Sequence, residues 1–130
     1  MFTIQQIKET HARVKSGADF PQYIQNLIAL GLQHYDNYVS DGHAIYFGDG
    51  DFSLTDEAKY AVMDIADTND TEKFKHYIKI HQQGETDYPT FCRHAAETGV
   101  EKWTVDMVDM TCTYYDKAGN KMVVETIPLP

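Results

Sequence analysis

The sequence predicts a single α+β domain, and three observations support this. Segments with helical periodicity come in blocks, and antiparallel hairpin signals stand between the blocks instead of alternating with single helices. The chain has 130 residues, which is the size of one domain. Its 42% hydrophobic and 24% charged residues are ordinary for a globular domain. We therefore expect an antiparallel sheet of at least four strands, with helices packed on one face.

Two helices are expected at the start of the chain. The first covers residues 3–16, where Thr3 caps the helix and Gly17 stops it. The second begins at Asp19-Phe20-Pro21, because proline suits the first turn of a helix. It ends at Gly31, which can adopt the left-handed conformation of a helix cap.

A β-hairpin is expected next. Residues 32–40 and 43–47 are rich in strand formers, and Asp41-Gly42 separates them. A two-residue Asp-Gly loop between such runs is the strongest short-range signal for a hairpin.

The middle of the chain is predicted to be helical. Thr55 would cap a helix over residues 55–67, in which small and aliphatic residues have helical spacing. A capping box of Asn69 and Glu72 would start the next helix. Asp87-Tyr88-Pro89 would open a further helix, and Gly99 would close it.

The last third is predicted to be a second hairpin, with strands over residues 100–115 and 121–127 around a turn at residues 116–120. Along the first of these strands, the alternation of apolar and polar residues changes parity near Met107 and Val108. One extra residue would restore a single buried face, which predicts a β-bulge at this point.

The chain also contains an internal repeat. A displacement of 68 residues, from Asp19 to Asp87, superposes Asp19-Phe20-Pro21 on Asp87-Tyr88-Pro89 and brings Tyr35 onto Trp103. We infer two related helix–helix–hairpin halves, residues 3–50 and 71–128, joined by the helix over residues 55–67. The alternative is that Asp-x-Pro and glycine recur only as helix boundaries.

The charge of the chain excludes several classes of partner. Eleven Lys and Arg against twenty Asp and Glu give a net charge of −9. A nucleic-acid binder needs a basic patch. The longest basic run contains Lys73, Lys75 and Lys79, but acidic and aromatic residues stand among them, so it does not form such a patch. No apolar run approaches the ~20 residues of a membrane span, and the first residues do not resemble a signal peptide. We expect a cytoplasmic protein that binds neither nucleic acid directly nor a membrane.

Neither a cofactor nor a metal nor a catalytic site is indicated. Cys92 and Cys112 are far apart, lie among apolar residues, and are expected to be buried thiols. The segment that starts at Asp49 superficially resembles a calcium loop, but Leu54 and Tyr60 occupy the sixth and twelfth positions, where glycine and glutamate are needed.

Two groups of residues remain as candidates for function. His34 and Asp36 share one face of a predicted strand about 7 Å apart, as a catalytic base and its orienting carboxylate could, but no nucleophile is indicated. Aromatic residues could form a contact surface, or they could lie at the boundary of sheet and helices with a structural role. These residues are Tyr35, Tyr38, Tyr46, Tyr88, Trp103, Tyr114 and Tyr115.

The run from Asp87 to Pro128 resembles the small YdfO-like and YbcV-like bacterial proteins, which are often prophage-encoded and sometimes labelled phage envelope proteins. The stretches that carry the resemblance are Gly99-Val100-Glu101-Lys102-Trp103 and Thr111-Cys112-Thr113-Tyr114-Tyr115-Asp116, with Gly119 in the turn. A weaker similarity extends through residues 19–50. The resemblance implies an α+β domain of unknown function and a link to prophages, and it supplies no catalytic residues.

The leading functional hypothesis is a non-enzymatic module that binds another protein, with a homodimer as a further possibility. One alternative is a small enzyme or ligand-binding protein that uses an aromatic and acidic cleft around His34, Asp36 and Trp103. Another is an acidic decoy that mimics DNA. A flat aromatic surface would favour the binding module, a deep polar pocket the enzyme, and an acidic ridge the decoy.

Overall fold

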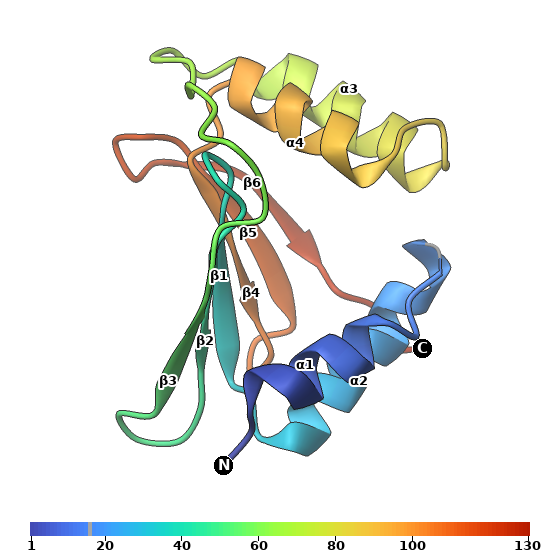
Figure 1. Cartoon of the computed structure of the whole chain (residues 1–130). Coiled ribbons are helices and arrows are strands. Elements are labelled where there is room, and N and C mark those ends of the chain that lie inside the picture. Colours follow the sequence, from blue (N-terminus) through green and yellow to red (C-terminus); the bar gives the residue numbers. More distant parts are fainter. Residues whose placement is uncertain (16) are drawn as a thin grey trace.

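The chain folds as an α+β domain, as predicted. The structure is a computed structural model that describes residues 1–15 and 17–130. Within these residues, four α-helices lie on one side of a six-stranded antiparallel sheet with the order β3-β2-β1-β4-β5-β6 (Figure 1). The helices are α1 (Ile4–His11), α2 (Phe20–Leu30), α3 (Thr71–Gln82) and α4 (Tyr88–Glu97). The strands are β1 (His34–Tyr38), β2 (Ala44–Phe47), β3 (Ser53–Asp56), β4 (Lys102–Asp106), β5 (Thr111–Tyr115) and β6 (Lys121–Thr126).

The first helix pair forms where the sequence predicts it. Thr3 caps α1 in a capping box with Gln6, and α1 ends at His11, earlier than expected. At its end the Arg13 and Val14 N–H groups donate to the Thr10 and His11 carbonyls (3.2 and 3.0 Å), and the Lys15 N–H donates to the Asp19 carboxylate (2.8 Å). The predicted helix end, Ser16, lies outside the described residues. The boundaries of α2 are confirmed, with Gly31 in the left-handed conformation (φ 104°).

The second helix pair is also present. The carboxylate of Asp70 caps α3 by accepting from the Lys73 N–H, so the cap lies one residue after the predicted Asn69. The Asn69 amide instead donates to the Asp116 carboxylate (2.8 Å). Asp87 caps α4 by accepting from the Thr90 N–H, as its position before Pro89 indicates.

The predicted helix over residues 55–67 is wrong. Residues 53–56 form β3, and residues 57–70 cross to α3 without regular structure; we call residues 57–70 the strap. Backbone N–H groups of the strap donate to carbonyls elsewhere in the fold, from Lys59 to Asp41 (2.8 Å) and from Met63 to Ser40 (2.7 Å). These hydrogen bonds to distant carbonyls take the place of hydrogen bonds within a helix. Residues 57–70 therefore form no helix, although their apolar residues have helical spacing.

The first hairpin has a longer loop than the predicted Asp-Gly pair. The Tyr38 N–H donates to the His43 carbonyl, and the Gly42 N–H donates back to the Tyr38 carbonyl (both 2.9 Å). Val39 follows β1 with its side chain fully buried in the core, and its N–H donates to the Glu101 carbonyl (3.0 Å).

The predicted single strand over residues 100–115 is two strands, and the predicted bulge at Met107 and Val108 is wrong. The chain reverses between β4 and β5, where the Asp106 carboxylate accepts from the Val108 and Asp109 N–H groups (2.8 and 3.0 Å). Met110 completes the turn in the left-handed region (φ 56°). The change of parity in the sequence therefore marks a reversal of direction.

The two halves of the chain have the same element order. Each contains two helices followed by three antiparallel strands, one strand more than predicted. Asp36 and Thr104, 68 residues apart, are partners in the central β1–β4 pair. The sheet order is symmetric about this pair, so an approximate twofold axis passes between Asp36 and Thr104. That the halves arose by duplication stays a prediction.

Candidate functional site

The helices leave one face of the sheet open (Figure 1). Side chains alternate along each strand, so every second residue points away from the helices. The strand register arranges these residues in three rows across the sheet, which together we call the open face. The rows are Phe47, His34, Asp106 and Thr111; Ile45, Asp36, Thr104, Thr113 and Val124; and Tyr38, Lys102 and Tyr115.

A polar and aromatic network occupies the middle of the open face. The Asp36 carboxylate accepts a hydrogen bond from the Thr104 hydroxyl (2.6 Å) and lies 3.7 Å from Lys102 Nζ. The same Nζ lies over the rings of Tyr38 (5.7 Å) and Tyr115 (5.5 Å), in cation–π geometry. Because Asp36 and Lys102 neutralise each other, the centre of the open face carries little net charge.

His34 and Asp36 lie on the same face, as predicted, but the structure does not join them as a catalytic pair. The His34 ring stacks on Phe47, with centroids 4.2 Å apart, while Asp36 binds Thr104 and Lys102. A carboxylate that orients a catalytic histidine must accept a hydrogen bond from its ring, and here the Asp36 carboxylate has other partners. Their arrangement suits a contact surface.

Trp103 lies on the other side of the sheet. It is the register partner of Asn37, and its ring packs near Tyr88, Phe91 and Tyr114 at centroid distances of 5.8–6.4 Å. It is 8% exposed, so the ring belongs to the core. The predicted cleft around His34, Asp36 and Trp103 is therefore wrong, because alternation along β4 directs Trp103 away from the other two.

The sequence reasoning missed His43. Its ring stacks on Tyr38 with centroids 4.3 Å apart, and its Nδ1 lies 2.6 Å from an oxygen of Asp41. Hydrogen bonds from the backbone N–H and the ring of His43 hold the pKa of Asp41 below its usual value. The Asp-x-His spacing in the hairpin loop was the available signal. The pair extends the aromatic surface of the open face beyond the end of β1.

Both cysteines are buried and unpaired, as expected. Burial raises the pKa of Cys92, although hydrogen bonds with the Tyr60 and Tyr88 hydroxyls oppose the shift. Burial likewise raises the pKa of Cys112 to about 12. Since the thiolate is the reactive form, neither cysteine is prepared for nucleophilic attack at neutral pH.

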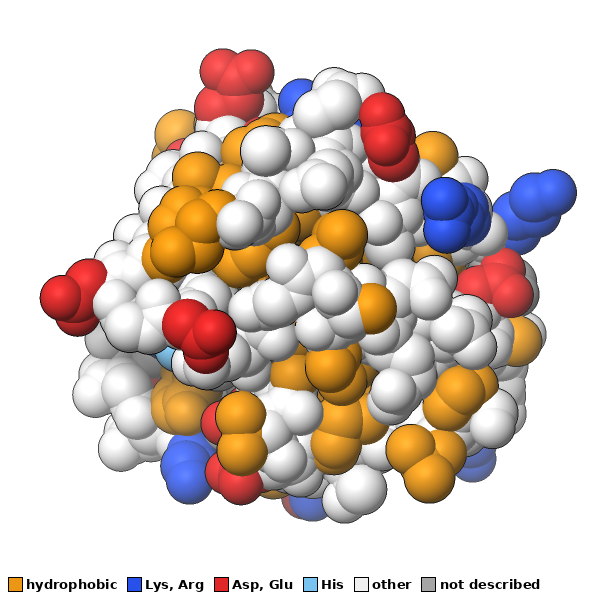
Figure 2. All heavy atoms as spheres, turned by 90° about the horizontal axis from the view of Figure 1, so that it is seen from below, with side chains coloured by type: hydrophobic (Ala, Val, Ile, Leu, Met, Phe, Trp, Pro, Cys, Tyr) orange, Lys and Arg blue, Asp and Glu red, His pale blue; other side chains and the backbone are white. Residues whose placement is uncertain are grey.

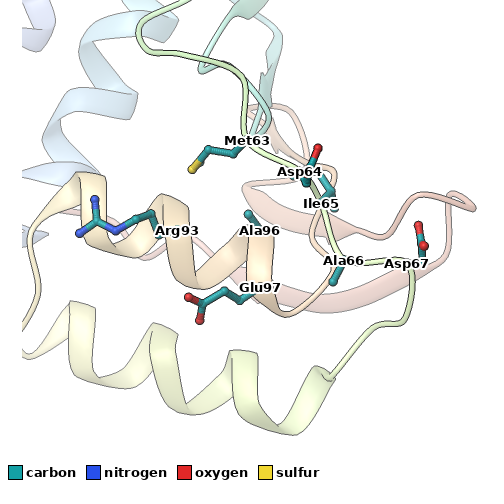
Figure 3. Close-up of a pocket in the computed structure, with 8 residues that line it drawn as sticks. All are labelled: Met63, Asp64, Ile65, Ala66, Asp67, Arg93, Ala96 and Glu97. Atoms are coloured by element: carbon teal, nitrogen blue, oxygen red, sulfur yellow. The ribbon is translucent and has the colours of Figure 1, made fainter.

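A groove of about 400 Å³ runs between the strap and α4 (Figure 3). Its floor is apolar, formed by Met63, Ala66 and Ala96. Charged side chains from both elements surround the floor: Asp64 and Asp67 from the strap, and Arg93 and Glu97 from α4. None of its lining residues is a Ser, Thr, Cys or His, and its apolar floor can hold an apolar side chain.

The segment compared with a calcium loop is the turn between β2 and β3. Asp49 accepts a hydrogen bond from the Gln33 side chain (2.6 Å), and the Phe52 N–H donates to the Asp49 carbonyl. Within residues 1–15 and 17–130, no three His, Cys, Asp or Glu side chains are grouped to hold a metal ion. In the same part of the chain, no helix has the length and apolar character needed to cross a membrane.

The chain belongs to a family described as "Protein of unknown function (DUF1398)", whose profile matches residues 8–126. Among curated proteins, no sequence matches the chain. The matched residues run from the second half of α1 to the end of β6, and the family description assigns no activity.

Proposed function

We propose that the protein is a non-enzymatic protein-binding module and that the open face contacts its partner. The observation that carries this proposal is the aromatic and nearly neutral centre of that face, where Lys102 lies between Tyr38 and Tyr115. Tyrosine and other aromatic residues supply much of the binding energy at protein interfaces.

The charge of the molecule favours a protein over a nucleic acid as the partner. A polyanion would meet Asp36 and Asp106 on the open face, on a chain with a net charge of −9. Lys102 is 31% exposed and already shares its charge with Asp36. A flat protein surface with apolar and hydrogen-bonding groups fits this chemistry.

We further infer that the chain is of the YdfO-like and YbcV-like kind, with a link to prophages. The stretches that support this inference include Lys102-Trp103 and Thr111–Tyr115, which form β4 and β5 at the centre of the fold. A cytoplasmic location fits the two unpaired thiols, because cysteines stay reduced in that compartment.

Two valines allow a matched test of the open face. Val124 is 55% exposed on β6, in the same row as Thr113, whereas Val62 is 78% exposed on the strap. Affinity capture from the producing cell, followed by calorimetry with the purified partner, compares the wild type with V124K and V62K. We expect V124K to weaken binding at least tenfold, since it places a desolvated charge in the interface, and V62K to bind normally.

If all three proteins bind the partner equally, the open face is not the binding surface. Failure of the wild-type protein to capture a partner at micromolar concentration would contradict the binding module itself. Circular dichroism and melting curves must match among the three proteins, so that a loss of binding is not a loss of folding.

A further inference from the structure

The open face is large enough to be covered by a second copy of the chain. It spans six strands of four to six residues each. At about 4.8 Å between strands and about 3.4 Å between residues, it measures about 29 by 17 Å. Covering this area on two copies buries about 1,000 Å² in total, which is near the lower limit for a specific protein interface. The open face therefore suits a dimer of modest affinity.

The charged side chains of the open face suit a copy of the same surface. Its three rows contain two carboxylates, Asp36 and Asp106, and one ammonium group, that of Lys102. His34 is the register partner of Asp106 on the neighbouring strand. A surface that carries both signs of charge can be complementary to its own copy, provided that a twofold axis brings unlike groups together.

The geometry of sheet packing restricts how a second copy can lie on the open face. Two sheets that pack face to face keep their strand directions within about 30° of each other. The twofold axis of such a dimer therefore runs either across the strands or along them. An axis across the strands, through the middle row, would place Asp36 opposite Asp36 of the second copy. An axis along the strands, between β1 and β4, exchanges these two strands and places Asp36 opposite Thr104 of the second copy.

The axis along the strands also brings together the other unlike groups of the open face. Each row of one copy then lies over the same row of the other copy in reverse order. His34 lies opposite Asp106 of the second copy, and Tyr38 lies opposite Lys102 of the second copy. Lys102 is also one row, or about 7 Å along the strand, from Asp36 of the second copy, within reach of its long side chain. No carboxylate of the three rows faces another carboxylate in this arrangement.

We propose that the open face binds a second copy of the chain, about a twofold axis that runs along the strands between β1 and β4. This inference rests on the proposed function, because it names the partner of the same surface. The dimer also covers apolar side chains of the face. Val124, which is 55% exposed, lies opposite Thr55 of the second copy, and the half-buried Ile45 lies opposite Thr113 of the second copy. Removing this apolar surface from water favours association.

The net charge of −9 on each copy opposes association, but it is not concentrated on the open face. Two of the twenty acidic residues lie in the three rows, and Lys102 accompanies them. At the end of the molecule shown in Figure 2, the acidic side chains stand apart from one another. Exposed charges more than about 8 Å apart are largely screened at physiological salt. The unlike groups that meet across the two open faces therefore decide the electrostatic contribution to binding.

Reversal of the two central charges tests this arrangement. D36K gives the centre of the face two ammonium groups and K102D gives it two carboxylates, so each variant alone opposes like charges in the dimer. An equal mixture of the two variants opposes ammonium groups with carboxylates. Sedimentation velocity of the purified proteins at about 0.15 M salt measures their association. We expect a wild-type dissociation constant of about 1–100 µM, at least tenfold weaker association of each variant alone, and recovery in the mixture.

A matched pair of variants keeps the test independent of folding at the centre of the face. V124K should weaken the dimer at least tenfold, whereas V62K, on the strap, should leave it unchanged. If melting curves show that a charge variant does not fold, the comparison of V124K with V62K decides.

Three results would overturn the inference. They are a wild-type protein that stays monomeric up to about 200 µM, a V124K protein that dimerises like the wild type, and a mixture of folded D36K and K102D that associates no better than either alone. If a monomeric wild-type protein captures a different protein and V124K does not, the inference fails while the proposed function stands.

Discussion

Residues on the adjacent strands β1 and β4 have opposite roles in this protein, and Trp103 and His34 show this most clearly. Trp103 points into the core, where its ring contacts rings from α4 and β5. His34 points to the open face, where it is half-buried and stacks on Phe47. The direction of each side chain across the sheet, which follows from strand alternation, decides the role of the residue.

We expect Trp103→Ala to lower the free energy of unfolding by about 3–5 kcal/mol, because it removes a buried ring and leaves a cavity. His34→Ala should change it by no more than about 0.5 kcal/mol, as is usual for surface substitutions. Urea unfolding of both variants measures the difference. A Trp103→Ala protein that unfolds at the wild-type midpoint yet no longer binds its partner would instead make Trp103 a binding residue.

Among the elements, the strap depends on a close approach to the end of α4. Gly99 has a φ of 93°, and a Cβ atom there would lie 2.7 Å from the Thr68 carbonyl oxygen and 2.9 Å from Asn69 Cα. Gly119 has a similar φ of 84° in the β5–β6 turn, with no other atom within 4 Å of an added Cβ. The two glycines therefore share a conformation and differ in the space around them.

Alanine at each position separates these two effects. Gly119→Ala should lower the free energy of unfolding by about 1 kcal/mol, which is the strain of a left-handed alanine. Gly99→Ala should cost about 1–3 kcal/mol more, because the strap backbone must move. Thermal unfolding of the two variants measures the difference. An equal decrease in the free energy of unfolding would mean that the strap backbone moves to accommodate the alanine without loss of stability.

The sequence predicts the elements that local signals define. Asp19-Phe20-Pro21 with Gly31, and Asp87-Tyr88-Pro89 with Gly99, bound α2 and α4 because caps and prolines act within one turn of a helix. The α+β class follows because segments with helical periodicity come in blocks, with hairpin signals between the blocks. On the open face, the shared side of His34 and Asp36 follows from strand alternation alone.

The elements that sequence reasoning missed depend on distant contacts. Residues 57–70 have helical spacing, but hydrogen bonds to Asp41 and Ser40 hold the strap extended. The β4–β5 turn contains neither glycine nor proline, and Met110 adopts the left-handed conformation without any sign in the sequence. The groove combines residues from the strap and α4, so no local pattern could reveal it.

At the scale of the whole molecule, the core contains several ionisable groups. Burial raises the pKa of Tyr46 and of Cys112 to about 12, from ordinary values of 10.0 and 9.0. Burial also raises the pKa of Tyr35 and of Tyr114 well above the usual range. In the folded protein these groups keep their protons at a pH where the unfolded chain loses them.

The protein should therefore lose stability in alkali. The unfolded state binds fewer protons than the folded state above about pH 9 for Cys112 and above about pH 10 for each tyrosine. Above these values the free energy of unfolding falls by about 1.4 kcal/mol per pH unit for each such group. This stability is fully present below pH 9 and is lost as the pH rises toward 12. Urea unfolding at a series of pH values from 8 to 11 measures the slope.

Cys112→Val provides the matched control for this prediction. The substitution keeps an apolar side chain of similar size opposite Val105 and removes one ionisable group. Its slope between pH 9 and 11 should be shallower than that of the wild type by about 1.4 kcal/mol per pH unit. Identical slopes would show that Cys112 does not take part in the alkaline transition.

The central pairing of β1 with β4 has a consequence for aggregation. An exposed strand edge can recruit the strands of other molecules, and each three-stranded half has two edges. Joining the halves at β1 and β4 hides one edge of each, so β3 and β6 form the edges of the sheet. β3 has four residues and ends at Asp56, which pairs with Lys59 (2.7 Å), while β6 carries Lys121 and Glu125. Both outer edges are thus short or charged, and the unprotected edges are enclosed where the two halves meet.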